Sequence, residues 1–232
     1  MDSVECSIIV PANNEEENLE PLTDELAKVL GGIDYEIILV DDHSSDGTGE
    51  LCDGLAGKNG RITSIHRSRG DNGMGNALKE GYAAARGRYV IWFMGDRSDE
   101  PDMIPEILRE LESGYDMVIA SRYMEGGSRG DLKLEKAIYG STYTKLARAI
   151  FGIPVHDITN AFRGFKREIL DDVELESEDF AISPEFAIKA HMKGLKLGEV
   201  PTTYHNRRAG KAKFSTLKMS LRFLSLFKLR LI

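Results

Sequence analysis

Apolar runs typical of buried strands alternate with helix-like stretches through the first half of this chain, and this alternation restricts the fold more than any other feature. The expected strands are rich in β-branched and aromatic residues and cover Cys6–Pro11, Tyr35–Val40, Ile62–His66, Tyr89–Met94 and Met117–Ala120. The helices expected between them end near Leu30 or cover Thr48–Ala56, Asn76–Ala85 and Met103–Glu112. Such alternation predicts an α/β protein with a mostly parallel sheet and right-handed crossovers.

The second half of the chain is less regular. The expected elements are a helix over Leu132–Phe151, an extended segment over Ile158–Lys166, a helix over Pro184–Met192 and a strand over Lys196–Tyr204. The tail Phe214–Ile232 is amphipathic and basic, which is typical of a helix on a bilayer surface and also of a terminal helix docked on the sheet. We expect one domain over residues 1–212 and a C-terminal helix over residues 213–232.

Length and charge restrict the class of function. A chain of 232 residues suffices for one large α/β domain. The net charge of -8 argues against nucleic acid as the main partner. Cys6 and Cys52 form neither a metal-binding spacing nor a disulfide framework, so we expect a reducing, cytosolic setting. Because the N-terminus is acidic and lacks an apolar core, we do not expect it to be a signal peptide, and no apolar run reaches the roughly 20 residues that span a bilayer.

An acidic segment follows the fourth expected strand. The run Tyr89–Pro101 breaks at Gly95 into polar residues that include Asp96, Asp99 and Glu100. Ligands of open α/β sheets bind beyond the carboxyl ends of the strands, and carboxylate oxygens there are placed to hold Mg²⁺ or Mn²⁺. The alternative is a solvated turn whose acids cap the next helix.

Two further polar clusters fall on the same predicted edge. P-A-N-N-E, residues 11–15, ends the first strand, and D-D-H-S-S-D-G-T, residues 41–48, ends the second. Carboxylates at such positions bind a ribose hydroxyl or a base N–H. Neither G-x-G-x-x-G after the first strand nor a P-loop lysine motif is present, which disfavours a dinucleotide enzyme or a P-loop NTPase. The glycine-rich run 70–75 is either a phosphate cradle or a turn that permits close packing.

These motifs together resemble those of a known family. P-A-N-N-E, L-V-D-D-H-S-S-D-G-T, R-S-R-G-D-N-G-M-G-N-A and the acidic loop are similar to inverting glycosyltransferases of family 2, which have the GT-A fold and use nucleotide-sugar donors. The later segments S-R-Y-x-x-G-G, D-I-T-N-A-F-R-G-F-K-R, E-V-P and R-R-A-G-K-A-K-F resemble the dolichol-phosphate mannose synthase branch, in the form without transmembrane helices.

The resemblance implies a donor site. Pro11, Asn13 and Glu15 would line the nucleotide pocket, although the family usually has Tyr where Asn13 stands. Asp42 would bind the base or ribose, with Asp41 supporting it.

The resemblance also implies a cation site, from which this chain departs. Asp96 matches the last acid of the family's D-x-D motif, and Ser98 stands where the family often supplies a further metal-binding side chain. Met94 occupies the place of the first acid, so the motif reads M-G-D. The loss of one anionic ligand should weaken the binding of Mg²⁺ or Mn²⁺, and the candidates to replace it are Asp99 and Glu100.

Basic residues fit an acceptor that is itself a phosphate. The expected phosphate ligands are Arg122, Lys136, Arg163, Arg207 and Lys213, with Arg208 and Lys211 nearby in sequence. Each of them has a solvated surface charge as the alternative interpretation. Arg163 is the exception, because it stands between aromatic residues in A-F-R-G-F.

The implied mechanism is an inverting transfer. A phosphate monoester is already a dianion at neutral pH, with a second pKa of about 6, so it needs no proton removed. The expected catalytic residues are Asp96, Arg163 and Asp157, with Asp157 orienting Arg163 or the donor sugar rather than acting as an obligatory base.

The sequence therefore predicts a transferase that moves mannose from GDP-mannose or glucose from UDP-glucose onto dolichyl or polyprenyl phosphate, located at the cytoplasmic face of a membrane. One alternative is an enzyme of the same fold that acts on a glycan hydroxyl. Another is a nucleotide-sugar-binding protein that has lost catalysis, which Met94 suggests.

Overall fold

A computed structural model describes residues 4–209 and 216–231, with the side chains of residues 216–218 and 231 left out of the description. The first half holds β1 (Cys6–Ala12), α1 (Glu16–Val29), β2 (Tyr35–Asp42), α2 (Thr48–Lys58), β3 (Ile62–Arg67), α3 (Met74–Ala84), β4 (Tyr89–Trp92), the 3₁₀ turn η1 (Pro101–Met103) and α4 (Ile104–Glu112). The second half holds β5 (Met117–Ser121), α5 (Leu134–Phe151), β6 (Arg163–Lys166), α6 (Ile169–Asp172), α7 (Ile182–Met192), β7 (Leu197–Pro201), α8 (Thr216–Ser225) and η2 (Leu226–Leu231).

The strands form one sheet of seven in the order β3-β2-β1-β4-β6-β5-β7. Among the strands that the structure describes, only β6 runs antiparallel to its neighbours, β4 and β5. The chain moves outward from β1 to β3 and then returns to the other side of β1 with β4. This reversal creates a topological switch point beside β1, where open α/β sheets place their ligands. The predicted α/β class with a mostly parallel sheet is confirmed.

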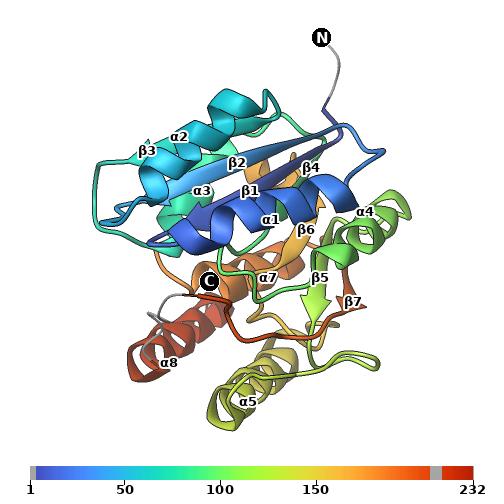
Figure 1. The fold of residues 1–232 in the computed structure, drawn as a ribbon. Coiled ribbons are helices and arrows are strands. Elements are labelled where there is room, and N and C mark those ends of the chain that lie inside the picture. Colours follow the sequence, from blue (N-terminus) through green and yellow to red (C-terminus); the bar gives the residue numbers. More distant parts are fainter. Residues whose placement is uncertain (1–3, 210–215, 232) are drawn as a thin grey trace.

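Helices cover both faces of the sheet, as Figure 1 shows. In β1, Ile8 and Val10 belong to one buried cluster and Ile9 to the other, because successive side chains of a strand point to opposite faces. One cluster includes apolar residues of α1, α2 and α4. The other includes residues of α3, α5, α7 and α8. The sheet is therefore buried on both sides and its carboxyl edge is left for the site.

The irregular second half differs from the sequence expectation at three places. Of the extended segment expected over Ile158–Lys166, only β6 is a strand. The last strand ends at Pro201, and beyond it a single bridge joins Ser128 to Thr203. The tail is not one helix, because α8 gives way to η2 at Leu226. Parts of all three segments line the cavity, and there contacts with distant residues take the place of regular strand or helix hydrogen bonds.

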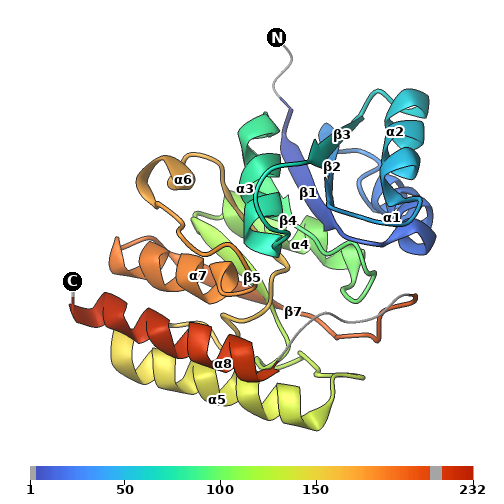
Figure 2. The ribbon, with the colours of Figure 1, turned by 90° about the vertical axis from the view of Figure 1, so that its left-hand side faces the viewer.

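The C-terminal helix packs against α5, and the two helices lie side by side in Figure 2. The rings of Tyr143 and Phe223 are 5.0 Å apart between centroids, and the hydroxyl of Tyr143 donates a hydrogen bond to the carbonyl of Phe223 at 3.0 Å. Arg222 also reaches Asp179 at 3.5 Å. The tail is thus docked, but on α5 rather than directly on the sheet, and exposed leucines and isoleucines remain on both α5 and α8.

Candidate active site

A cavity of about 410 Å³ opens at the carboxyl edge of the sheet. Its lining includes the predicted residues Pro11, Asn13, Glu15, Asp42, Asp96, Ser98, Arg122, Lys136 and Arg207. These side chains come from segments far apart in sequence, and parallel strands with a shared carboxyl edge bring them together. Asp42 and Asp96 share one cavity, which is the juxtaposition that the sequence predicts.

Asp42 is held by several groups at the end of β2. One carboxylate oxygen accepts hydrogen bonds from Arg67 and from His43, the latter at 2.9 Å, and the other oxygen accepts the amide of Gly73 at 2.6 Å. Asn13 donates from its side-chain amide to the Asp42 carbonyl at 2.6 Å. Asp42 therefore has a fixed orientation at the rim of the cavity.

Arg67 is a site residue that sequence reasoning missed. Its side chain is buried, and it also donates to the carbonyl of Arg69, so it ties the glycine-rich loop to Asp42. The strand register pairs Asp42 directly with Arg67. The two are the last residues of neighbouring strands, and that position was the signal available in the sequence.

Asp41 lies behind the cavity wall. Its carboxylate accepts the amide of Ser44 at 3.2 Å and contacts His66 at 3.3 Å. His66 in turn lies 2.8 Å from Asp53 on the exposed side of β3. Asp41 thus shapes the loop after β2, as a supporting residue would.

The glycine-rich run packs against backbone. A Cβ on Gly73 would lie 2.3 Å from the Glu178 carbonyl oxygen, and one on Gly75 would lie 2.5 Å from that of Ser177. The amide of Asn76 donates to Glu178 at 3.2 Å. Of the two interpretations of this run, the structure shows the turn for close packing, since these glycines admit a chain segment directly over the start of α3.

Glu15 links the two halves of the molecule. Its carboxylate accepts hydrogen bonds from Asn18 at 2.7 Å and from Arg207, which lies in the segment after β7. Burial raises the pKa of Glu15, and the hydrogen bonds and charge of Arg207 oppose the rise. Arg207 therefore lines the cavity, and its guanidinium is held by the carboxylate of Glu15.

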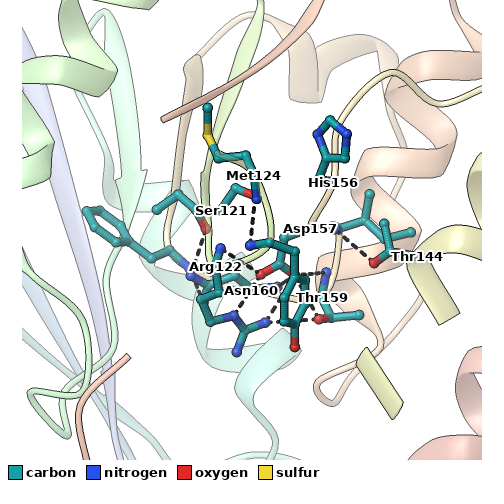
Figure 3. Close-up of polar contacts among 12 residues, drawn as sticks. Ser121, Arg122, Met124, Thr144, His156, Asp157, Thr159 and Asn160 are labelled. Carbon is teal, nitrogen blue, oxygen red and sulfur yellow. Dashed lines mark hydrogen bonds and ion pairs between the residues drawn. The ribbon is translucent and has the colours of Figure 1, made fainter. Parts of the chain in front are cut away.

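Arg122, which lines the cavity, forms a buried ion pair with Asp157, which does not line it. Nε and Nη2 of Arg122 donate to the two carboxylate oxygens at 2.7 Å and 3.0 Å, as drawn in Figure 3. The same carboxylate also accepts the amides of Thr159 and Asn160. Burial alone would raise the pKa of Asp157, but Arg122 and these hydrogen bonds hold it below the ordinary value. Asp157 is fully buried and saturated with donors, so it is not available as a base.

Arg163 does not join the cavity, and its predicted role as a phosphate ligand is incompatible with its position. Its side chain is fully buried on β6. The guanidinium donates to the carbonyls of Ile158, Asn160 and Ser183 instead. Burial lowers its pKa to about 9, so it remains protonated at neutral pH. The aromatic residues around Arg163 in the sequence reflect its packing against Trp92 in the core. The guanidinium of Arg163 is oriented by backbone carbonyls rather than by Asp157.

Asp96 and Ser98 are the expected metal ligands, and both face the cavity. Asp96 also accepts the amide of Ser98 at 3.1 Å, which closes a tight turn. Oxygen donors of this kind suit Mg²⁺ or Mn²⁺. Within the described residues, no three His, Cys, Asp or Glu side chains converge as a cation site. Lys213 lies outside the described residues.

Another part of the cavity lining is apolar and comes mainly from α5 and α8. It includes Leu132, Tyr139, Gly140, Met219 and Phe223. The ring centroids of Tyr139 and Phe223 lie 5.8 Å apart in a stacked arrangement. A single cavity therefore offers carboxylates, guanidinium and ammonium groups, and an aromatic surface.

Comparison with solved structures shows which known fold this chain has. Glucosyl-3-phosphoglycerate synthase from Mycobacterium tuberculosis, solved with Mn²⁺, UDP-glucose and phosphoglyceric acid, superposes with a TM-score of 0.71 at 20% identity, over 97% of this chain and 79% of that one. The fold is the GT-A type of α/β fold. The Glycosyl transferase family 2 model matches residues 7–174, so the chain belongs to glycosyl transferase family 2.

Two curated relatives narrow the branch. The chain is 31% identical over 214 residues to the dolichol-phosphate mannosyltransferase of Pyrococcus furiosus, covering 90% of this chain and 59% of the relative. It is 31% identical over 215 residues to the polyprenol monophosphomannose synthase of Mycolicibacterium smegmatis, covering 90% of this chain and 80% of the relative. The predicted family and branch resemblance is thereby confirmed. In the parts of the chain that are described, none of the helices has the length and apolarity to cross a bilayer.

Proposed function

We propose that this protein transfers a hexose from a nucleotide sugar, GDP-mannose or UDP-glucose, to dolichyl or another polyprenyl phosphate with inversion at the anomeric carbon. The single observation that carries this proposal is the composition of the cavity, in which an acidic rim, basic groups and an apolar wall meet. A polyprenyl phosphate has an anionic headgroup on an apolar chain. The headgroup suits the basic groups of the cavity, and the chain suits its apolar wall. The names of the two relatives support the same acceptor class.

The roles follow from the positions of the side chains. Asp42 and Asn13 hold the nucleoside end of the donor at the carboxyl edge of β1 and β2. Arg122, fixed by Asp157, presents its guanidinium to the acceptor phosphate, and Lys136 on α5 adds a second cation at the apolar wall. The acceptor dianion attacks the anomeric carbon, the bond to the donor diphosphate breaks, and no proton transfer is needed.

A divalent cation fits beside Asp96 and Ser98 because both are oxygen donors on the cavity wall. When bound, it would neutralise charge on the departing diphosphate. The M. tuberculosis relative was crystallised with Mn²⁺ and with Mg²⁺, which supports this expectation.

The membrane surface is the proposed location of the reaction. Apolar side chains stand exposed along α5 and α8: Leu134, Ile138, Leu146, Ile150, Leu221 and Leu224. On α5 they stand four or eight residues apart, which makes a stripe along one side of the helix. Lys133, Lys145 and Arg222 are exposed on the same two helices or next to them. A bilayer under these helices would bring a lipid acceptor to the apolar wall of the cavity.

The test is a transfer assay with radiolabelled GDP-mannose or UDP-glucose and a short polyprenyl phosphate. We expect a labelled lipid product, and no product when the free polyprenol replaces its phosphate. Transfer to a glycan or to the free alcohol would favour the alternative enzyme of the same fold. Donor binding without turnover on any of these acceptors would favour the binding protein.

A further inference from the structure

The loop after β4 lacks one carboxylate of the expected pair. Met94 is packed against the apolar core, and a soft thioether is a poor ligand for a hard divalent cation. This leaves Asp96 as the only acid of the motif. The chain must either bind a cation more weakly or take a second oxygen ligand from elsewhere.

The backbone of this loop sorts its side chains to two sides. Arg97 has a positive φ of 56°, and its guanidinium points to Glu25 on α1. Asp96, Ser98 and Asp99 line the cavity. The left-handed backbone at Arg97 therefore turns the positive guanidinium away from the cavity, while the side-chain oxygens of the neighbouring residues stay on its wall.

Asp99 is a buried carboxylate that lacks a strong partner. Its exposed fraction is 6%, yet it lines the same cavity as Asp96. Its one hydrogen bond is a long one of 3.4 Å from the side-chain amide of Asn160. Across the described residues, its other oxygen has neither a hydrogen bond nor an ion pair. Buried carboxylates are normally paired or bound to a metal, so an oxygen left unpaired on the cavity wall points to a ligand.

Glu100 is the competing candidate, and its carboxylate is already occupied. One oxygen accepts the amide of Thr203 at 2.9 Å, and the other lies 3.1 Å from Nε2 of His205. Glu100 therefore braces the segment after β7. The two adjacent acids have different surroundings, and only Asp99 faces the donor site.

We propose that Asp99 is the second anionic ligand of a divalent cation held with Asp96, in place of the acid that Met94 has replaced. Mg²⁺ and Mn²⁺ accept one or two carboxylates together with phosphate oxygens and water, which agrees with a pair of acids rather than a cluster of three. This proposal rests on the proposed function only in that a donor diphosphate would complete the cation's ligands.

The test measures Mn²⁺ binding directly, by the loss of the free-ion electron paramagnetic resonance signal, on the whole protein with and without GDP or UDP. We expect Asp99→Asn to weaken Mn²⁺ binding about 10-fold or more, as loss of a ligand group does. Glu100→Gln is the matched control and should leave the Mn²⁺ affinity nearly unchanged, because the Glu100 carboxylate contacts Thr203 and His205 and does not line the cavity. The double variant Met94→Asp/Asp99→Asn should regain the affinity, because it restores an acid at the place of Met94.

Unchanged Mn²⁺ affinity in Asp99→Asn would overturn the proposal, and so would the absence of Mn²⁺ binding in the wild-type protein. Intact affinity combined with the loss of a basic limb in the pH–rate profile would instead make Asp99 a base for a hydroxyl acceptor. Thermal unfolding of each variant shows whether it is folded, and recovery in the double variant excludes a folding defect as the cause. Failure of the transfer assay leaves the Mn²⁺ measurement valid, because the latter needs no turnover.

Discussion

The acidic rim and the apolar wall of the cavity are built in different ways. The rim follows from strand ends, with Asp42 at the end of β2 and Asp96 just beyond β4. The wall consists of side chains on α5 and α8, which meet through the contacts of Tyr139 and Tyr143 with Phe223. The rim thus depends on where the strands of the sheet end, whereas the wall depends on packing between two helices; in the proposed function the rim binds the donor and the wall binds the acceptor. Substitutions in the wall should therefore affect structure and acceptor use together, and substitutions in the rim should affect donor binding.

The largest expected effect comes from breaking the Arg122–Asp157 pair. Asp157→Asn leaves a buried guanidinium without its counter-charge, so we expect a loss of about 3–5 kcal/mol in the free energy of unfolding. Urea denaturation followed by circular dichroism measures this loss.

The double variant Arg122→Met/Asp157→Asn separates stability from function, because asparagine at position 157 keeps an acceptor oxygen for the amides of Thr159 and Asn160. It removes both charges, so it should recover much of the free energy of unfolding. Transfer to polyprenyl phosphate should stay low in this variant because no guanidinium faces the acceptor. Recovery of both stability and transfer would show that the pair is only structural.

A smaller effect should follow from changes to the outer face of the wall. Leu221→Ser/Leu224→Ser removes two exposed leucines of α8, and burial of each leucine side chain in a bilayer is worth up to about 1.5–3 kcal/mol. Vesicle co-sedimentation should therefore show binding weakened by about 10-fold or more.

Tyr115→Ser is the control for this measurement, since Tyr115 is also exposed but lies between α4 and β5. It should leave vesicle binding unchanged. Equal sedimentation of the leucine variant and the wild-type protein would contradict a bilayer contact through α8.

The smallest effect concerns His66, which touches the rim only through Asp41. A hydrogen bond to Asp53, and a weaker one to Asp41, raise the pKa of His66 above its ordinary value of 6.5. Because the folded protein holds this proton more tightly, the stabilisation is complete below pH 6.5 and is lost as the pH rises through the folded pKa. We expect His66→Gln to be less stable than wild type near pH 5.5 by no more than about 1 kcal/mol, as for exposed pairs, and equally stable near pH 9. Melting temperatures at the two pH values test this, and an equal deficit at both would contradict it.

The same contrast explains which parts of the site could be predicted. Asp42 and Asp96 could be placed together from the sequence because the carboxyl ends of parallel strands share an edge. Arg163 could not, because nothing in A-F-R-G-F distinguishes an arginine bonded to three backbone carbonyls from one facing a phosphate. The pairing of Asp157 with Arg122 is set by a loop conformation rather than by a repeat. The exposed apolar stripe on α5 has its residues four or eight positions apart, a pattern present in the sequence. The basic and small residues between them made the pattern hard to recognise.

The tie between Glu15 and Arg207 has a consequence for how the chain is made. The two residues are 192 positions apart, and the backbone of Ser177 and Glu178 roofs the first turn of α3. The acidic rim therefore acquires its last supports only after Arg207 has left the ribosome. A nascent chain halted at residue 174, where the family match ends, would contain every acid of that rim. It would still lack Arg207 and the backbone of Ser177 and Glu178, which support the rim.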